Sequence, residues 1–152
     1  MIQRIQSIWL LLASITVFLL LAIPVASSID GDKEFWIKAT GLFQQVNGVV
    51  TKITTFTPLL ISTIAVGIMC FAVIFSYKKR SIQKRLCIVL MAMVASLSFW
   101  TFSYVQKIPG GLANASFSAG IALPILAIAF CALAIRGITK DEMLLRSADR
   151  LR

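Results

Sequence analysis

The longest charge-free stretch of the chain spans residues 108–135 and reads IPGGLANASFSAGIALPILAIAFCALAI. Three further stretches without Asp, Glu, Lys or Arg cover residues 53–77, 5–29 and 86–106, and the chain contains no histidine. In that order the four stretches are 28, 25, 25 and 21 residues long. An α-helix needs roughly 20 mostly apolar residues to cross a bilayer. The stretches therefore predict four membrane-spanning helices.

The composition agrees with a membrane protein. Of 152 residues, 59% are hydrophobic and only 14% are charged, and the mean hydropathy is +0.90. Soluble domains are about 45–50% apolar and about 25% charged. The composition excludes a soluble globular domain, a disordered chain and a disulfide scaffold. The sequence predicts an all-α membrane protein that forms a single four-helix bundle over residues 1–152.

We place the spans at residues 8–26, 58–77, 86–104 and 117–135. Alternating ten-residue strands are absent from the sequence, which argues against a membrane barrel. For the first span, a cleaved secretory signal ending near Ser27 is the alternative. The long charge-free run without a small-x-small cleavage site favours an uncleaved helix.

Three residues bear on the ends and shape of these helices. Thr57 and Pro58 suit the cap and first turn of the second span. Pro124 predicts a kink inside the fourth span, because proline removes one backbone hydrogen bond and displaces a carbonyl.

The distribution of basic residues predicts the orientation. The N-terminus, the basic loop at 78–85 and the tail at 136–152 together hold 11 Lys and Arg residues, against 4 elsewhere. Loops rich in Lys and Arg stay in the cytoplasm. Both termini are therefore expected to be cytoplasmic, with the loop at 27–56 and the short loop around residue 110 on the outer side.

The outer loop at 27–56 supports two interpretations. Its apolar residues can share one face of a helix between residues 35 and 46. Asn47–Gly48, however, is a strong signal for a β-hairpin turn, and β-forming residues flank it. We favour a small hairpin that packs over the bundle. The alternative role is an apolar loop that docks an outer partner.

The tail is expected to form a C-terminal amphipathic helix. Thr139 and Glu142 have the spacing of a capping box. In the following residues, apolar side chains can form a stripe on one face while arginines supply positive charge. This pattern is typical of helices that continue from a span or lie on a membrane surface.

Residues that perform chemistry are scarce. Without histidine, His-based acid–base and nucleophilic catalysis is excluded, and no charged residue falls inside a predicted span. Cys70, Cys87 and Cys131 are far apart and lack the spacing of metal ligands, so we interpret them as buried, inert thiols. We therefore expect no enzyme activity, catalytic residue, cofactor or metal site.

Two surfaces are candidates for interaction. The first is a set of basic residues that would contact a partner protein or anionic lipid: Arg4, Lys78, Lys79, Arg80, Lys84, Arg85, Arg146, Arg150 and Arg152. Nucleic acid is not favoured, because no nucleic-acid-binding motif is present. The second is a groove for a lipid or quinone beside the third and fourth spans, formed by Ser96, Trp100, Ser103, Tyr104, Gly120 and Pro124.

The two ends of the chain carry a family resemblance. The start MIQRIQS at residues 1–7 and the end RSADRLR at 146–152 occur together with Arg85–Leu86–Cys87, Ile135–Arg136–Gly137 and Lys140–Asp141–Glu142. In these motifs the sequence resembles a Bacteroidota membrane-protein family, domain of unknown function 4293. The resemblance implies a four-helix protein of the bacterial inner membrane with both termini inside, and it favours β structure in the outer loop. It implies no activity.

The sequence therefore predicts a non-enzymatic accessory or stabilising subunit of a larger membrane complex. The alternative is a small membrane protein that binds or carries a lipid or quinone.

Overall fold

The computed structural model describes residues 3–30, 33–78, 80–109 and 114–149, with side chains described for 5–30, 33–76, 80–109 and 114–144. Its long helices are α1 (Gln3–Ala22), α2 (Thr57–Ile74), α3 (Arg80–Val105) and α4 (Ala122–Asp149). Its strands are β1 (Ala26–Asp30), β2 (Lys33–Lys38), β3 (Gly41–Val46), β4 (Val49–Thr55) and β5 (Ala115–Phe117). Short 3₁₀ turns η1 (Phe75–Lys78) and η3 (Ala119–Ile121) precede α3 and α4.

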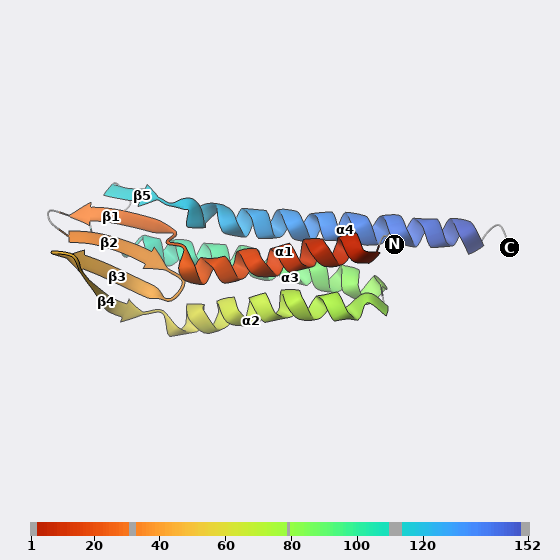
Figure 1. Ribbon diagram of the computed structural model, residues 1–152, viewed down its shortest axis with the longest axis horizontal. Helices are drawn as coiled ribbons and strands as arrows, with labels where there is room; N and C mark the ends of the chain where they lie inside the picture. The colour runs from red at the N-terminus through yellow and green to blue at the C-terminus, as the bar shows by residue number, and fades with distance from the viewer. Residues whose placement is uncertain (1–2, 31–32, 79, 110–113, 150–152) are drawn as a thin grey trace.

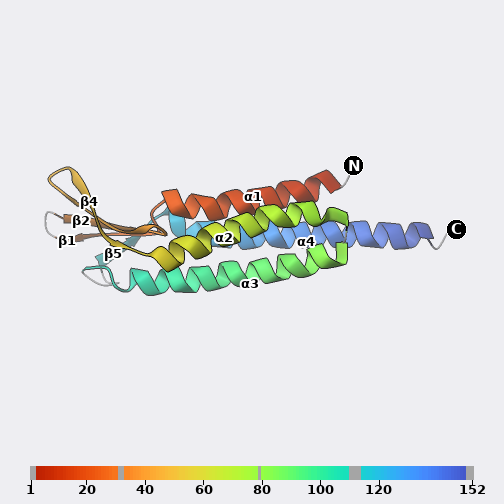
Figure 2. The ribbon, with the colours of Figure 1, turned by 90° about the horizontal axis from the view of Figure 1, so that it is seen from below.

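The four helices form an antiparallel bundle in which each helix packs on two neighbours, in the ring α1–α2–α3–α4. All strands lie at one end, which we call the sheet end (Figure 1). The start of α1, the connection from α2 to α3 and the last turns of α4 lie at the opposite end (Figures 1 and 2). We call this the basic end, because Arg80, Lys84, Arg85 and Arg136 are there.

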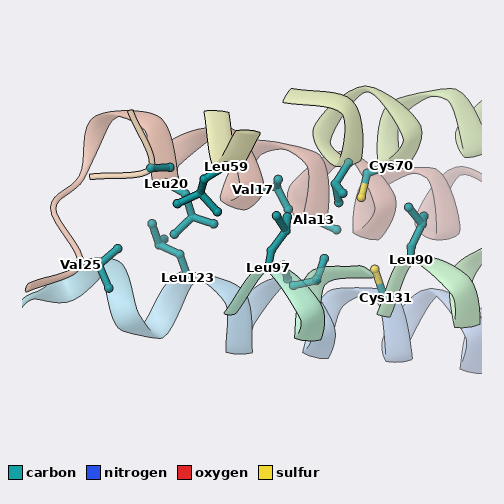
Figure 3. Close-up of a cluster of buried hydrophobic side chains, with 14 of the residues drawn as sticks. Ala13, Val17, Leu20, Val25, Leu59, Cys70, Leu90, Leu97, Leu123 and Cys131 are labelled. Atoms are coloured by element: carbon teal, nitrogen blue, oxygen red, sulfur yellow. The ribbon is translucent and has the colours of Figure 1, made fainter. Parts of the chain in front are cut away.

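The interior of the bundle holds aliphatic side chains, hydroxyls and thiols. Leu10, Leu59 and Leu90 are fully buried, and Figure 3 shows how side chains of all four helices meet along the axis. Ser14 Oγ of α1 donates to the Gly67 carbonyl of α2 over 2.9 Å. All four helices are long and apolar enough to cross a membrane.

The sheet is antiparallel with strand order β4-β3-β2-β1-β5. β3 and β4 form a hairpin around Asn47 and Gly48, whose φ angles of 51° and 82° fit the expected turn. Backbone hydrogen bonds tie the sheet to the bundle, because Ala39 N donates to Leu20 O over 3.3 Å and Gly120 N donates to Pro24 O over 3.2 Å.

The prediction of an all-α protein is wrong. The hairpin belongs to a five-stranded antiparallel sheet, and the alternative of a helix over residues 35–46 is also wrong. In β2 the side chains alternate, with Phe35 and Ile37 buried at 6% and 1% exposure while their neighbours are more open. Apolar residues occur in both a period of two and a period near 3.6 here, so the local pattern did not separate strand from helix.

Several expected boundaries also differ. α1 ends at Ala22, before Pro24, rather than at residue 26. Residues 80–85 of the expected basic loop are already the first turns of α3. α4 runs without a break into the tail, which is one of the two arrangements predicted for the tail helix. Thr139, however, is not a cap there but donates to Ile135 O over 2.9 Å within the helix.

Pro58 stands in the first turn of α2 as predicted, whereas the predicted cap of α2 and the proline kink are wrong. The N-cap of α2 is Phe56, without a side-chain cap hydrogen bond, and Thr57 is the first helical residue. Pro124 does not kink a helix midway, because it stands in the first turn of α4, directly after η3. Proline is tolerated there because first-turn N–H groups have no intrahelical acceptor. The Gly120 carbonyl accepts a hydrogen bond from Ala122 N–H.

Candidate functional site

The six residues of the expected groove do not line one common recess. Ser96 and Trp100 line a recess of about 330 Å³ against α2. Gly120 and Pro124 line another recess of about 240 Å³, together with Leu20, Val25, Ser98, Thr101 and Phe102 among others. We call the second one the α3–α4 recess. Ser103 and Tyr104 line neither recess.

The α3–α4 recess offers apolar surface rather than hydrogen-bond donors. Ser98 Oγ donates to Val94 O over 2.8 Å, and Thr101 Oγ1 donates to Leu97 O over 2.7 Å. Both hydroxyl protons are therefore used within α3, as is common for Ser and Thr inside helices. The remaining lining is aliphatic, aromatic, Gly or Pro, so the recess suits an apolar chain better than a polar headgroup or a quinone ring.

Gly120 allows the chain to close the sheet end of the bundle. A Cβ atom at this position would come within 2.4 Å of the Pro24 carbonyl oxygen. Gly120 is thus required for the close approach of η3 to the start of β1. Its role in the recess is to shape the wall.

Of the nine basic residues predicted to contact a partner or lipid, three have described side chains. Arg80, Lys84 and Arg85 lie in the first two turns of α3 at the basic end. Arg80 Nη1 is buried and has no hydrogen-bond partner among the described residues. The side chains of Arg4, Lys78 and Arg146, and residues Lys79, Arg150 and Arg152 altogether, lie outside the described part.

A buried polar pair lies at the basic end and was missed by sequence reasoning. The Gln6 side-chain amide of α1 donates to the Asp141 carboxylate of α4, and the two residues are 4% and 5% exposed. The only signal in the sequence was that α1 begins with a polar turn that must face something in the bundle.

The three cysteines, distant in sequence, meet inside the bundle. Cys70, Cys87 and Cys131 belong to α2, α3 and α4 and are fully buried. The side chains of Cys70 and Cys131 interact with each other, with Cys87 nearby; Figure 3 shows the first two facing the bundle interior. No group of three or more ligating side chains is placed to hold a metal ion, as far as the described residues extend.

The outermost strand β4 is the most exposed regular element. All seven of its residues are exposed, including the large apolar side chains of Val49 at 64%, Val50 at 53% and Ile53 at 46%. Because β4 pairs with β3 alone among the described strands, its other edge carries backbone N–H and C=O groups available to an additional strand. The sequence suggested an apolar loop here, but not an open sheet edge.

These features define a small protein of four long apolar helices that carries an antiparallel sheet at one end. The chain belongs to the family described as Domain of unknown function (DUF4293), whose model matches residues 2–151. No curated protein matches the chain. The family establishes kinship over nearly the whole chain and leaves the activity to be argued from the molecule.

Proposed function

We propose that the chain is an integral protein of the bacterial inner membrane. The helix surfaces support this, because large apolar side chains point away from the bundle: Phe99 is 76% exposed, Ile125 68% and Ile61 61%. In water such a surface would make the protein aggregate, whereas the acyl chains of lipid solvate apolar side chains. Hydroxyls such as those of Ser14 and Thr63 point inward instead and bond to carbonyls.

The orientation follows from the basic end. Arg80, Lys84, Arg85 and Arg136 lie there, and the positive-inside rule assigns such an end to the cytoplasm. In this orientation both termini are cytoplasmic and the sheet projects from the outer surface. The basic residues would contact anionic lipid of the inner leaflet.

The function that the geometry supports best is that of a non-enzymatic accessory subunit in a larger membrane complex. The exposed edge of β4 carries this proposal. An extended segment of a partner can add to such an edge through backbone hydrogen bonds, while its side chains contact Val49, Val50 and Ile53. The bundle would hold the edge at a fixed height above the membrane.

Site-specific photo-crosslinking tests the proposed edge. A photoreactive amino acid at Val50 in the full chain, expressed in its native membrane, should capture one defined membrane protein. The matched control is Ile29, which is 65% exposed on β1, at the other side of the sheet. The same partner should co-purify with the wild-type chain in mild detergent and be lost on Val49→Lys or Ile53→Lys.

Two results would contradict the accessory role. One is recovery of the chain alone from native membranes in mild detergent. The other is equal capture from positions 50 and 29, because that pattern indicates collision with neighbours rather than pairing at β4.

A second candidate function rests on the α3–α4 recess. Its apolar lining, with both hydroxyls bonded within α3, favours the acyl or isoprenoid chain of a membrane lipid. In this candidate function the recess therefore holds the apolar tail of a lipid rather than a headgroup or a quinone ring.

Mass spectrometry of co-purified lipids checks the second candidate. Ser98→Leu fills the recess and should deplete any specifically retained lipid, whereas Ser96→Leu, on the face of α3 toward α2, should not. The same lipid profile in both variants and wild type would remove this candidate.

A further inference from the structure

An aromatic and basic cluster lies on the open face of the sheet. Trp36 of β2 and Phe43 of β3 are direct cross-strand partners, and their rings stack with centroids 6.3 Å apart. Two ammonium groups stand against the same Phe43 ring, because Lys38 Nζ and Lys52 Nζ are each 5.7 Å from its centroid. We call these four residues the lysine–aromatic cluster.

The cluster lies at the end of the sheet nearest the helices. Lys38 is the last residue of β2, and the next residue, Ala39, is hydrogen-bonded to Leu20 in the last turn of α1. Lys52 is five positions before the start of α2 at Thr57. Strands rise about 3.3 Å per residue. Lys38 therefore lies within a few ångströms of the end of α1, and Lys52 lies no more than roughly one strand length from the start of α2. The headgroup layer occupies about 5–7 Å on each side of the hydrocarbon core.

On this face of the sheet, the positive charge lies nearer to the helices than the negative charge does. Lys38 lies at the near end of β2, while Glu34, on the same face, lies about 13 Å away along the strand. Within the described residues, neither Lys38 nor Lys52 forms an ion pair with a carboxylate. Two like charges gathered around one ring are favoured when an anion lies between or beside them.

The other cations at the sheet end follow a related pattern. Lys107, just after α3, lies with Nζ 5.4 Å from the centroid of the Tyr104 ring, and Tyr104 stacks on Phe56 beside the start of α2. Lys33, by contrast, is at the distal end of β2 and contacts no ring among the described residues. Aromatic rings and lysines gather at membrane–water interfaces, where rings prefer the headgroup level.

We propose that the lysine–aromatic cluster is a binding site for the phosphate of an anionic lipid headgroup in the outer leaflet. Lys38 and Lys52 donate hydrogen bonds to the phosphate oxygens, and Trp36 and Phe43 lie against the glycerol region. The site goes beyond the accessory role, and it rests on the membrane embedding and orientation proposed above. It would fix the height and tilt of the sheet relative to the bilayer.

The test uses the full chain in nanodiscs of phosphatidylcholine, with and without phosphatidylglycerol. Trp9→Phe and Trp100→Phe leave Trp36 as the sole tryptophan and therefore as a local probe. We expect phosphatidylglycerol to change Trp36 emission. Lys38→Gln with Lys52→Gln should abolish the emission change, or weaken phosphatidylglycerol binding as followed by Trp36 emission about tenfold or more, since each basic residue near anionic lipid contributes about 1 kcal/mol.

Matched variants separate a site from general charge. Lys33→Gln removes the same charge from the far end of β2 and should leave the emission change intact. Lys38→Arg with Lys52→Arg keeps the charge and should preserve it. Loss of the change in Lys33→Gln, or its persistence in the double Gln variant, would overturn the proposed site.

Two further outcomes identify the source of the phosphate and the level at which the proposal fails. If soluble glycerol phosphate displaces the lipid signal, the cluster binds free phosphate esters and the lipid site is overturned. If the chain does not incorporate into nanodiscs, the proposed membrane embedding is itself overturned. Incorporation without any change of Trp36 emission on addition of phosphatidylglycerol overturns only the lysine–aromatic cluster as a site.

Discussion

At the scale of single residues, the Gln6–Asp141 pair is the clearest case of a side chain whose environment determines its role. A carboxylate that is 5% exposed requires hydrogen-bond donors, and the Gln6 amide supplies one from α1. Gly137 faces Gln6, since a Cβ atom there would come 3.0 Å from Gln6 Cγ. The pair therefore joins the first and last helices at the basic end.

Asp141→Leu should destabilise the bundle by about 1–3 kcal/mol, because it leaves the buried Gln6 amide without its acceptor. The combined Gln6→Leu and Asp141→Leu variant should recover most of this loss, since replacing both partners leaves no unsatisfied group. Equilibrium unfolding in detergent micelles measures both changes. Lys140→Ala, at an exposed neighbouring position, is the control and should have little effect. Additive losses in the double variant would show that the pair is not coupled.

At the scale of elements, the β3–β4 hairpin depends on a glycine outside its turn. Gly41 has a φ of 151°, and a Cβ atom there would lie 2.2 Å from the Thr54 carbonyl oxygen. The register between the two strands shifts at Leu42 and Phe43, directly beside this contact. Glycine is therefore needed where β4 crosses closely over the start of β3.

Gly41→Ala should separate the near ends of β3 and β4 and lower stability by about 1–3 kcal/mol, because the obstructing atom is backbone and cannot rotate away. Hydrogen exchange of the amides in residues 41–55 should accelerate while exchange in the helices stays unchanged. Gln44→Ala, in the same strand at an ordinary strand position, is the matched control. Unaltered exchange in Gly41→Ala would show that the strand accommodates the methyl group.

The same scale explains why the expected groove was divided. Ser96 and Trp100 are four residues apart and lie on the same side of α3. Ser98 and Thr101 lie on another side of α3 and line the recess that Gly120 and Pro124 also line. The composition of the segment identified a polar and aromatic half of a helix. Only the helix neighbours determine which of its residues face the same space.

At the scale of the whole molecule, the basic end and the sheet end make the orientation testable. In a background with Cys70→Ala, Cys87→Ala and Cys131→Ala, a membrane-impermeant maleimide should label Val49→Cys in intact spheroplasts. Ser81→Cys, at the basic end, should be labelled only after permeabilisation. Ile68→Cys, 56% exposed on α2 and expected to face lipid, should resist labelling in both conditions. Labelling of position 81 before position 49 would reverse the proposed topology.

The sequence by itself determined the features that depend on local composition. Charge-free stretches of sufficient length predicted the helices later found as α1 to α4, and Asn47–Gly48 predicted the hairpin turn, because each signal lies within one segment. The tertiary structure decided everything that depends on residues far apart in sequence. It paired Ala26–Ser28 with Ala115–Phe117 to extend the sheet, buried Asp141 against Gln6 and brought Lys38 and Lys52 to one ring. The length of an apolar stretch is a local property of the sequence. Strand register and helix neighbours, in contrast, depend on which distant segments pack against each other.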